Sequence, residues 1–241
     1  MSYIYLKKEI KLKSSLRSKR KKILSGILLT TGIFFFLSAV FPIIKFQIEY
    51  SLKFKQIINP LSIESYNKSN NILRNMTTDY TQLSNWFVND TKNENNGQVK
   101  LIDNNQTVYY LSIPKLNIKD AVVTIGSMDL KKSLIQYPQT ALPGQLGNAV
   151  VFGHSVLPQF FNPKSYLTIF STLYKLKQGD EIIINFDKST YKYIIEEMYE
   201  IQPTDFSVLE QRFDNKNLTL ITCSPPGTYL RRLVIKAQLA L

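Results

Sequence analysis

The sequence predicts an all-β domain, a sandwich or a barrel with short helices, behind one membrane-spanning helix and a partly helical stalk. Two observations carry this prediction. From about residue 107, short apolar and β-rich runs alternate with Pro, Gly and Asn at intervals of roughly 8–15 residues. Before them, a basic tail is followed by a long uncharged apolar segment.

Positive charge is concentrated at the N-terminus. The chain of 241 residues carries a net charge of +12, and residues 1–22 hold nine basic residues and one acidic residue, or +8. The remainder carries +4, so a broad nucleic-acid-binding surface is not expected. With one Cys and one His, the chain cannot form an intramolecular disulfide and has too few ligands for a Cys/His zinc site. We therefore expect no metal and no cofactor.

Residues 23–44 (ILSGILLTTGIFFFLSAVFPII) form the predicted transmembrane helix. These 22 uncharged residues would span about 33 Å as a helix, enough for a hydrocarbon core of about 30 Å. The basic flank predicts a cytoplasmic tail at 1–22 and an extracellular remainder on a single-pass cell-membrane protein. A cleaved signal peptide and a buried core helix are the alternatives, but the run is long for the first and has no clear cleavage site.

Residues 45–106 read as a stalk and linker. Positions 46–106 contain 12 Asn, a poor former of helix interiors, so parts of this stretch should be irregular. One apolar stripe predicts a short amphipathic helix; it consists of Leu73, Met76, Tyr80, Leu83 and Phe87. Docking of this helix on its own domain is favoured over binding to a partner. Residues 91–105 (TKNENNGQVKLIDNN) are polar and turn-rich, as in a linker.

The last predicted domain covers residues 107–241. Its β-rich runs are TVYYLSIPKLNI, NAVVFGH, DEIIINF, TYKYIIEEMYEI, NLTLITC and RRLVIKAQLAL. Residues 165–177 (SYLTIFSTLYKLK) could form one helix among them. A domain of this length can bury a workable single core.

Three kinds of residue could carry chemistry. Cys223 ends an apolar strand and precedes a loop, where a nucleophile is often displayed. His154 also ends a strand; an imidazolium stabilises a thiolate and can then protonate a leaving amine. Arg231 and Arg232 begin the last strand, and a guanidinium can bind a developing oxyanion. Together, these types suffice for a cysteine acyl-transfer enzyme.

Taken singly, each of these residues has a more ordinary interpretation. A lone Cys is usually a buried, inert small group. A lone His is more often a surface or hydrogen-bonded residue than a catalyst. Arginines at a strand edge are usually solvated. Composition and spacing by themselves therefore leave catalysis open.

The order of these motifs resembles the sortase family. Residues 219–223 (TLITC) are similar to its TLxTC signature, and Arg232 looks like its third catalytic residue at the start of the last strand. Residues 143–154 (PGQLGNAVVFGH) resemble the segment that ends at the catalytic His, and residues 111–118 and 179–184 resemble two further strand entries. The only Cys and the only His both fall on motif positions.

The resemblance implies a closed eight-stranded β-barrel over 107–241 and a membrane-anchored cysteine transpeptidase. Cys223 would be the nucleophile, His154 the general acid and base, and Arg232 the stabiliser of the substrate carbonyl and oxyanion. Thr222 would line the oxyanion site and contact substrate. By strand alternation, Arg231 points to the opposite face.

The implied partners are secreted proteins with a C-terminal sorting motif, and an amine of a cell-wall precursor or a pilin. No nucleic acid is implied, and the lipid bilayer holds the anchor. Residues 223–227 (CSPPG) resemble the TC-x-P-x-G form of the housekeeping and pilin-type classes, but the Asp-Pro-aromatic lid of many pilin polymerases is missing. Two alternatives remain: a hydrolase with the same Cys-His-Arg site, and an inert membrane-tethered binding or assembly module.

Overall fold

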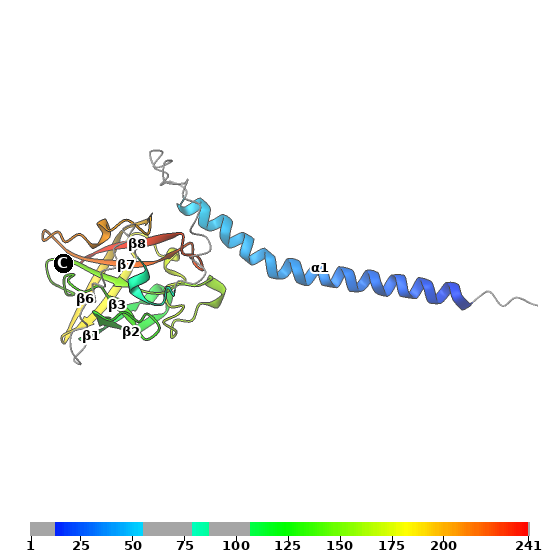
Figure 1. Ribbon diagram of the computed structural model, residues 1–241, viewed down its shortest axis with the longest axis horizontal. Coiled ribbons are helices and arrows are strands. Elements are labelled where there is room, and N and C mark those ends of the chain that lie inside the picture. The colour runs from blue at the N-terminus through cyan, green and yellow to red at the C-terminus, as the bar shows by residue number, and fades with distance from the viewer. Residues whose placement is uncertain (1–12, 55–78, 87–106, 241) are drawn as a thin grey trace, which may run out of the picture. The chain divides into compact units, whose positions relative to one another are not determined.

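The computed structural model describes residues 13–54, 79–86 and 107–240 (Figure 1). The chain divides into two compact units, residues 1–53 and residues 54–241.

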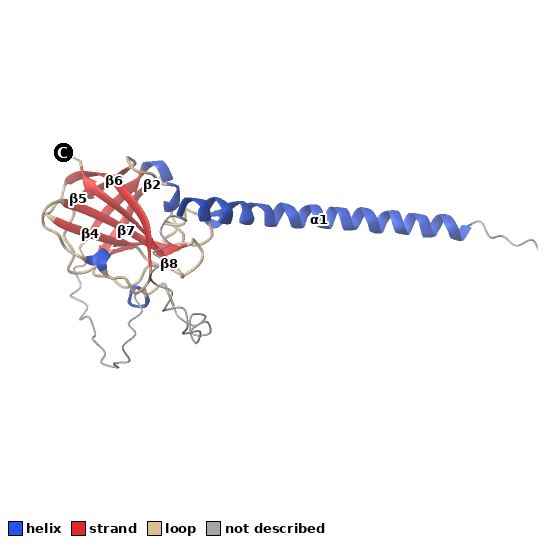
Figure 2. Ribbon diagram, turned by 90° about the horizontal axis from the view of Figure 1, so that it is seen from above, coloured by secondary structure: helices blue, strands red, loops and turns tan. Residues whose placement is uncertain are grey.

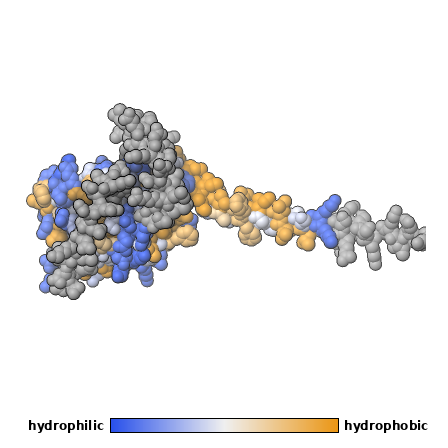
Figure 3. Space-filling model, viewed as in Figure 1, coloured by the Kyte–Doolittle hydropathy of each residue, from blue (hydrophilic) through white to orange (hydrophobic). Residues whose placement is uncertain are grey.

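The described residues of the first unit belong to one long helix, α1 (Lys13–Phe54), of 42 residues. It contains the predicted segment 23–44 and continues beyond it at both ends. Apolar side chains run along it (Figure 3), and Phe34, Phe35 and Phe36 are 69%, 72% and 67% exposed. Within the described residues, Lys21–Phe54 is the one helix long and apolar enough to cross a membrane. The prediction of a long apolar helix is therefore confirmed; its length and composition suit a membrane anchor, and its crossing of a membrane stays a prediction.

The second unit contains a closed eight-stranded barrel, as the resemblance implied (Figure 2). The neighbour order around the barrel is β1-β2-β3-β4-β7-β8-β6-β5. The strands are β1 (Val108–Ile113), β2 (Ile118–Ile125), β3 (Leu134–Gln136), β4 (Gly147–Phe152), β5 (Glu181–Phe186), β6 (Ser189–Ile201), β7 (Lys216–Ser224) and β8 (Arg231–Leu239).

The parallel pair β4 and β7 is almost entirely buried on both faces, and most of its side chains are apolar. Leu218 and Leu220 point into the barrel interior. There they join an apolar cluster to which the inward-facing side chains of all eight strands contribute. Ile221 and Cys223 point outward. They belong to a second buried cluster on the outer face, together with Phe152 of β4. The outer face of this pair of strands (the seam) is therefore apolar, and other parts of the chain cover it.

The predicted helix at residues 165–177 is wrong. The segment forms successive turns and a short 3-10 helix, Leu173–Lys175. The amide of Phe170 donates to the carbonyl oxygen of His154 at 3.1 Å, so it is not available for an α-helical bond. Ile169, Phe170 and Leu173 are buried in the interior cluster, which fixes the turns in place.

The amphipathic helix predicted around residues 73–87 is also wrong where it can be checked. Only 79–86 of it lies within the described residues, and there the chain forms a turn followed by a 3-10 helix, Leu83–Asn85. Two stripe residues, Tyr80 and Leu83, are nevertheless 6% and 2% exposed. The docking of this part on its own domain is confirmed for these two side chains, whereas Leu73, Met76 and Phe87 lie outside the described residues.

Candidate active site

The backbones of His154 and Cys223 lie close together because β4 and β7 run parallel in register. Phe152 pairs with Ile221, so the residues two positions further along each chain are again neighbours on the outer face. Three hydrogen bonds continue the seam past the end of β4. Gly153 N donates to Ile221 O at 3.1 Å, Thr222 Oγ1 to Gly153 O at 2.8 Å, and Ser155 Oγ to Cys223 O at 3.0 Å.

Gly153 is required at its position in this seam. A Cβ atom there would overlap the ring of Phe170 and lie 2.6 Å from Leu134 Cδ2. The chain can therefore pass directly from Phe152 to His154 only if the intervening residue has no side chain. The sequence motif contained this glycine, but its reason became visible only with the packing of Phe170.

Arg232 is the partner of Cys223 across the antiparallel pair β7 and β8. Its side chain is 1% exposed and donates to three main-chain carbonyls: Nη2 to Trp86 O at 2.7 Å, and Nη1 to Tyr229 O and Arg231 O at 3.1 Å each. In the described part of the chain, no carboxylate lies within ion-pair distance of Arg232, and its Nε has no hydrogen-bond partner. A buried cation without a counter-ion favours a developing negative charge beside it.

Arg231 faces the other way, as strand alternation predicted. Its guanidinium lies 3.5 Å from a carboxylate oxygen of Glu200, whose other oxygen accepts from the Ser224 hydroxyl. This pair ties β6, β7 and β8 together at the barrel rim.

Burial makes the uncharged forms of the thiol and imidazole more stable. It raises the pKa of Cys223 to about 11, although Arg232 acts in the opposite direction. It also lowers the pKa of His154 below its ordinary value, and nearby Asp79 partly offsets this effect. Cys223 is 0% exposed and His154 5%. Both shifts favour the uncharged forms of the thiol and the imidazole.

Residues 79–86, the cover segment, lie over this outer face. Trp86 is fully buried, meets Phe152 edge-on with ring centroids 5.5 Å apart, and donates Nε1–H to Tyr80 O at 2.7 Å. The guanidinium of Arg232 lies 5.2 Å from the centre of the Trp86 ring. The sequence reasoning missed Trp86, although its being the only Trp of the chain was a usable signal.

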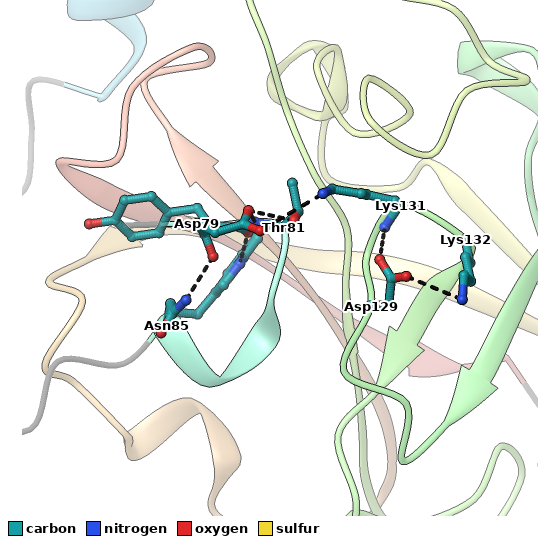
Figure 4. Close-up of polar contacts among 8 residues, drawn as sticks. Asp79, Thr81, Asn85, Asp129, Lys131 and Lys132 are labelled. Atoms are coloured by element: carbon teal, nitrogen blue, oxygen red, sulfur yellow. Dashed lines mark hydrogen bonds and ion pairs between the residues drawn. The ribbon is translucent and has the colours of Figure 1, made fainter. Parts of the chain in front are cut away.

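Polar contacts hold the outer side of the cover segment (Figure 4). The Asp79 carboxylate accepts from the amide and hydroxyl of Thr81 and lies 3.8 Å from Lys131 Nζ. Asn85 Nδ2 donates to Asp79 O at 2.8 Å, which closes the segment on itself. These contacts place a carboxylate and an ammonium near His154, where they act on its pKa in opposite directions.

Thr222 is fully buried, and its hydroxyl donates to Gly153 O. Its predicted contact with substrate stays a prediction. In the described residues, no three His, Cys, Asp or Glu side chains form a group that could hold a metal ion.

The sequence of the barrel domain matches that of a known family. A model of the Sortase domain family matches residues 111–240, more than half of the chain. The chain belongs to the sortase family. This is a family of cysteine transpeptidases.

Individual relatives support the assignment without selecting a sub-class. The sortase is 26% identical to sortase A of Bacillus anthracis over 57% of this chain and 62% of that protein. It is 29% identical to sortase A of Staphylococcus aureus over 50% of this chain and 57% of that protein. The pilus-related sortase C of Group B Streptococcus superimposes with a TM-score of 0.50 and 28% identity, over 58% of this chain and 70% of that one. The match thus spans about three-fifths of the curated relatives' length.

Proposed function

We propose that this sortase is a membrane-anchored cysteine transpeptidase that cleaves a C-terminal sorting motif of secreted proteins and transfers the acyl part to an amine. The observation that carries the proposal is the seam between β4, β7 and β8. It brings the only Cys, the only His and a buried Arg to one patch of the outer face, and none of the described carboxylates pairs with this Arg.

In the first half-reaction, Cys223 loses its proton to His154, and its sulfur attacks the carbonyl carbon of the scissile Thr–Gly-type peptide bond. The oxyanion that forms is stabilised by Arg232. The C–N bond then breaks, and His154 returns the proton to the leaving amine. The product is a thioester on Cys223.

In the second half-reaction, a primary amine attacks the thioester carbonyl. His154 accepts the proton of the amine and delivers it to the departing thiolate, which regenerates the thiol. The acceptor would be an amine of a cell-wall precursor or a pilin. The CSPPG form of residues 223–227 supports a place among the housekeeping or pilin-type classes.

The experiment uses the full chain in detergent micelles with short peptides that contain a Thr–Gly bond, with and without a primary amine. We expect an acyl adduct on Cys223 by intact mass, released by the amine as a new amide. Cys223→Ala is the control and should give neither product. Release by water alone would favour the hydrolase, and the absence of any adduct would favour an inert barrel.

Arg232→Lys tests the third residue. A lysine keeps the charge but cannot donate to three carbonyls from one plane, so we expect acyl transfer to fall by about a hundredfold or more. Turnover close to that of the unmodified chain would remove Arg232 from the assigned role.

A further inference from the structure

The main chain that carries His154 is held from two sides. On one side are the hydrogen bonds between β7 and Gly153 described above. On the other side lies the turn that contains Phe170 and Ser171. The amide of Phe170 donates to the carbonyl oxygen of His154 at 3.1 Å. The amide of Val156 donates to Ser171 Oγ at 2.8 Å, so the chain is fixed both at His154 and two residues after it.

The turn is itself fixed to the core of the barrel. Its side chains Ile169, Phe170 and Leu173 belong to the interior cluster and are at most 1% exposed. Ser171 lies between them in the chain and is fully buried as well. A hydroxyl on a buried and well-packed turn is an acceptor at a defined place, so it can hold the amide of Val156 in a defined position.

The imidazole ring lacks a hydrogen bond that would set its direction from the Nδ1 side. In the described part of the chain, Nδ1 of His154 is buried without a hydrogen-bond partner. In many catalytic histidines, a hydrogen bond to the second ring nitrogen fixes the ring and its tautomer. Here the position of the ring depends instead on packing and on the main chain that carries it.

We propose that Ser171 is a positioning residue for acyl transfer: its hydroxyl fixes the main chain after His154 and so keeps the imidazole where it can exchange a proton with Cys223. This inference rests on the proposed function, because it assigns proton transfer to His154. A displacement of about 1 Å in a catalytic group can cost about a hundredfold in rate. Since Ser171 is fully buried, its loss should affect the chemical step and not the binding of peptide.

The next residue in the turn, Thr172, provides a matched control. It is 3% exposed, and its hydroxyl has no hydrogen-bond partner among the described residues. Thr172→Val therefore removes a buried hydroxyl of the same turn without breaking a hydrogen bond, whereas Ser171→Ala removes the acceptor of the Val156 amide. Ser171→Thr keeps this acceptor and is the rescue variant. Ser171→Cys, with a weakly accepting sulfur, is the second test variant if Ser171→Ala does not fold.

The first readout is kinetic and uses the full chain in detergent micelles with Thr–Gly peptides and a primary amine. We expect Ser171→Ala to lower kcat for amide product by about tenfold or more, with KM changed by less than about twofold. Thr172→Val and Ser171→Thr should both keep kcat within about threefold of that of the unmodified chain.

The second readout does not depend on activity. His154 is the only His of the chain, so labelling with ¹³C-histidine gives one imidazole signal in the NMR spectrum. In Ser171→Ala, the ring should move more freely on the ps–ns timescale. We therefore expect a lower order parameter for its Cδ2–H bond than in the unmodified chain and in Thr172→Val.

Three results would overturn the proposal. One is a lowered melting temperature of Ser171→Ala with unchanged kcat and order parameter, which would make Ser171 a purely structural residue. The others are a loss of kcat in Thr172→Val equal to that in Ser171→Ala, and a loss of kcat in Ser171→Ala without any change in the ring signal.

A further result would separate this inference from the proposed function. A lower order parameter in Ser171→Ala, with no amide product even from the unmodified chain, would support the positioning of His154 by Ser171. The same result would contradict acyl transfer as the activity of the site.

Discussion

Thr219 and Thr222 lie on the same strand, and both bury a hydroxyl that donates at 2.8 Å. Thr219 bonds to the Asn148 side chain at one end of the β4–β7 seam, whereas Thr222 bonds to the main chain beside His154. A comparison of variants at the two threonines can therefore separate two effects. One is the loss of stability from a missing buried hydrogen bond, and the other is the loss of activity when His154 is held less firmly. Ser155, which donates to the carbonyl of Cys223, acts in the same place as Thr222.

Thr222→Val should lower kcat by about tenfold to a hundredfold with little change in KM, because the misplaced His154 affects the chemical step more than binding. Thr219→Val should leave both constants near those of the unmodified chain. Each variant should lose about 1 kcal/mol of stability by thermal unfolding, since each leaves one acceptor unsatisfied. A raised KM with unchanged kcat for Thr222→Val would instead support the predicted contact with substrate.

The pKa of Cys223, raised by burial to about 11, predicts its reactivity. At pH 8, about one thiol in a thousand is ionised, so alkylation by iodoacetamide should be slow and should accelerate about tenfold per pH unit up to about pH 11. Arg232 lowers this pKa, and Tyr229 faces the same thiol. A rate that levels off below pH 8 would mean that His154 and Cys223 form an ion pair.

The raised pKa of Cys223 also makes the stability of the fold depend on pH. The folded state favours the protonated thiol, so its contribution is fully present below the ordinary thiol pKa of 9.0 and is lost as the pH rises toward 11. The melting temperature of the unmodified chain should therefore fall between pH 9 and 11 relative to that of Cys223→Ala, which has no thiol to titrate. Parallel melting curves for the two chains over this range would contradict the raised pKa.

At the scale of elements, the passage from β4 to His154 depends on a residue without a side chain. Gly153→Ala would push Cβ into Phe170 and Leu134, and should cost about 1–3 kcal/mol of stability through forced repacking. Thermal unfolding of the full chain in micelles measures the loss. A melting temperature equal to that of the unmodified chain would show that Phe170 can move aside at no cost.

Strands and the long helix could be predicted because their signals are local. An apolar run of 22 residues, or the alternation along residues 218–223, contains its own evidence. The turns at 165–177 could not be predicted, since the amide of Phe170 bonds to His154, which is 16 positions earlier. The backbone of the cover segment could not be predicted for the same reason. Its partners are Asp129 and Arg232, which no local periodicity connects to it.

At the scale of the whole molecule, the basic tail and the apolar part of α1 predict an orientation. The tail at residues 1–22 should remain cytoplasmic and the barrel should lie outside. Protease added to intact cells should digest the barrel and leave an N-terminal tag protected until the membrane is opened. Protection of the barrel together with digestion of the tag would show the reverse orientation.

The parallel pairing of β4 with β7 has a consequence for how the enzyme acquires its activity. Gly147 pairs with Lys216, 69 positions further along the chain, so this seam requires a long loop to close before any of its contacts form. His154 and Cys223 lie on opposite sides of that seam. In a chain whose barrel has not closed, Cys223 and His154 are therefore far apart. The acyl transfer proposed above would then begin only after the last strands have joined the barrel.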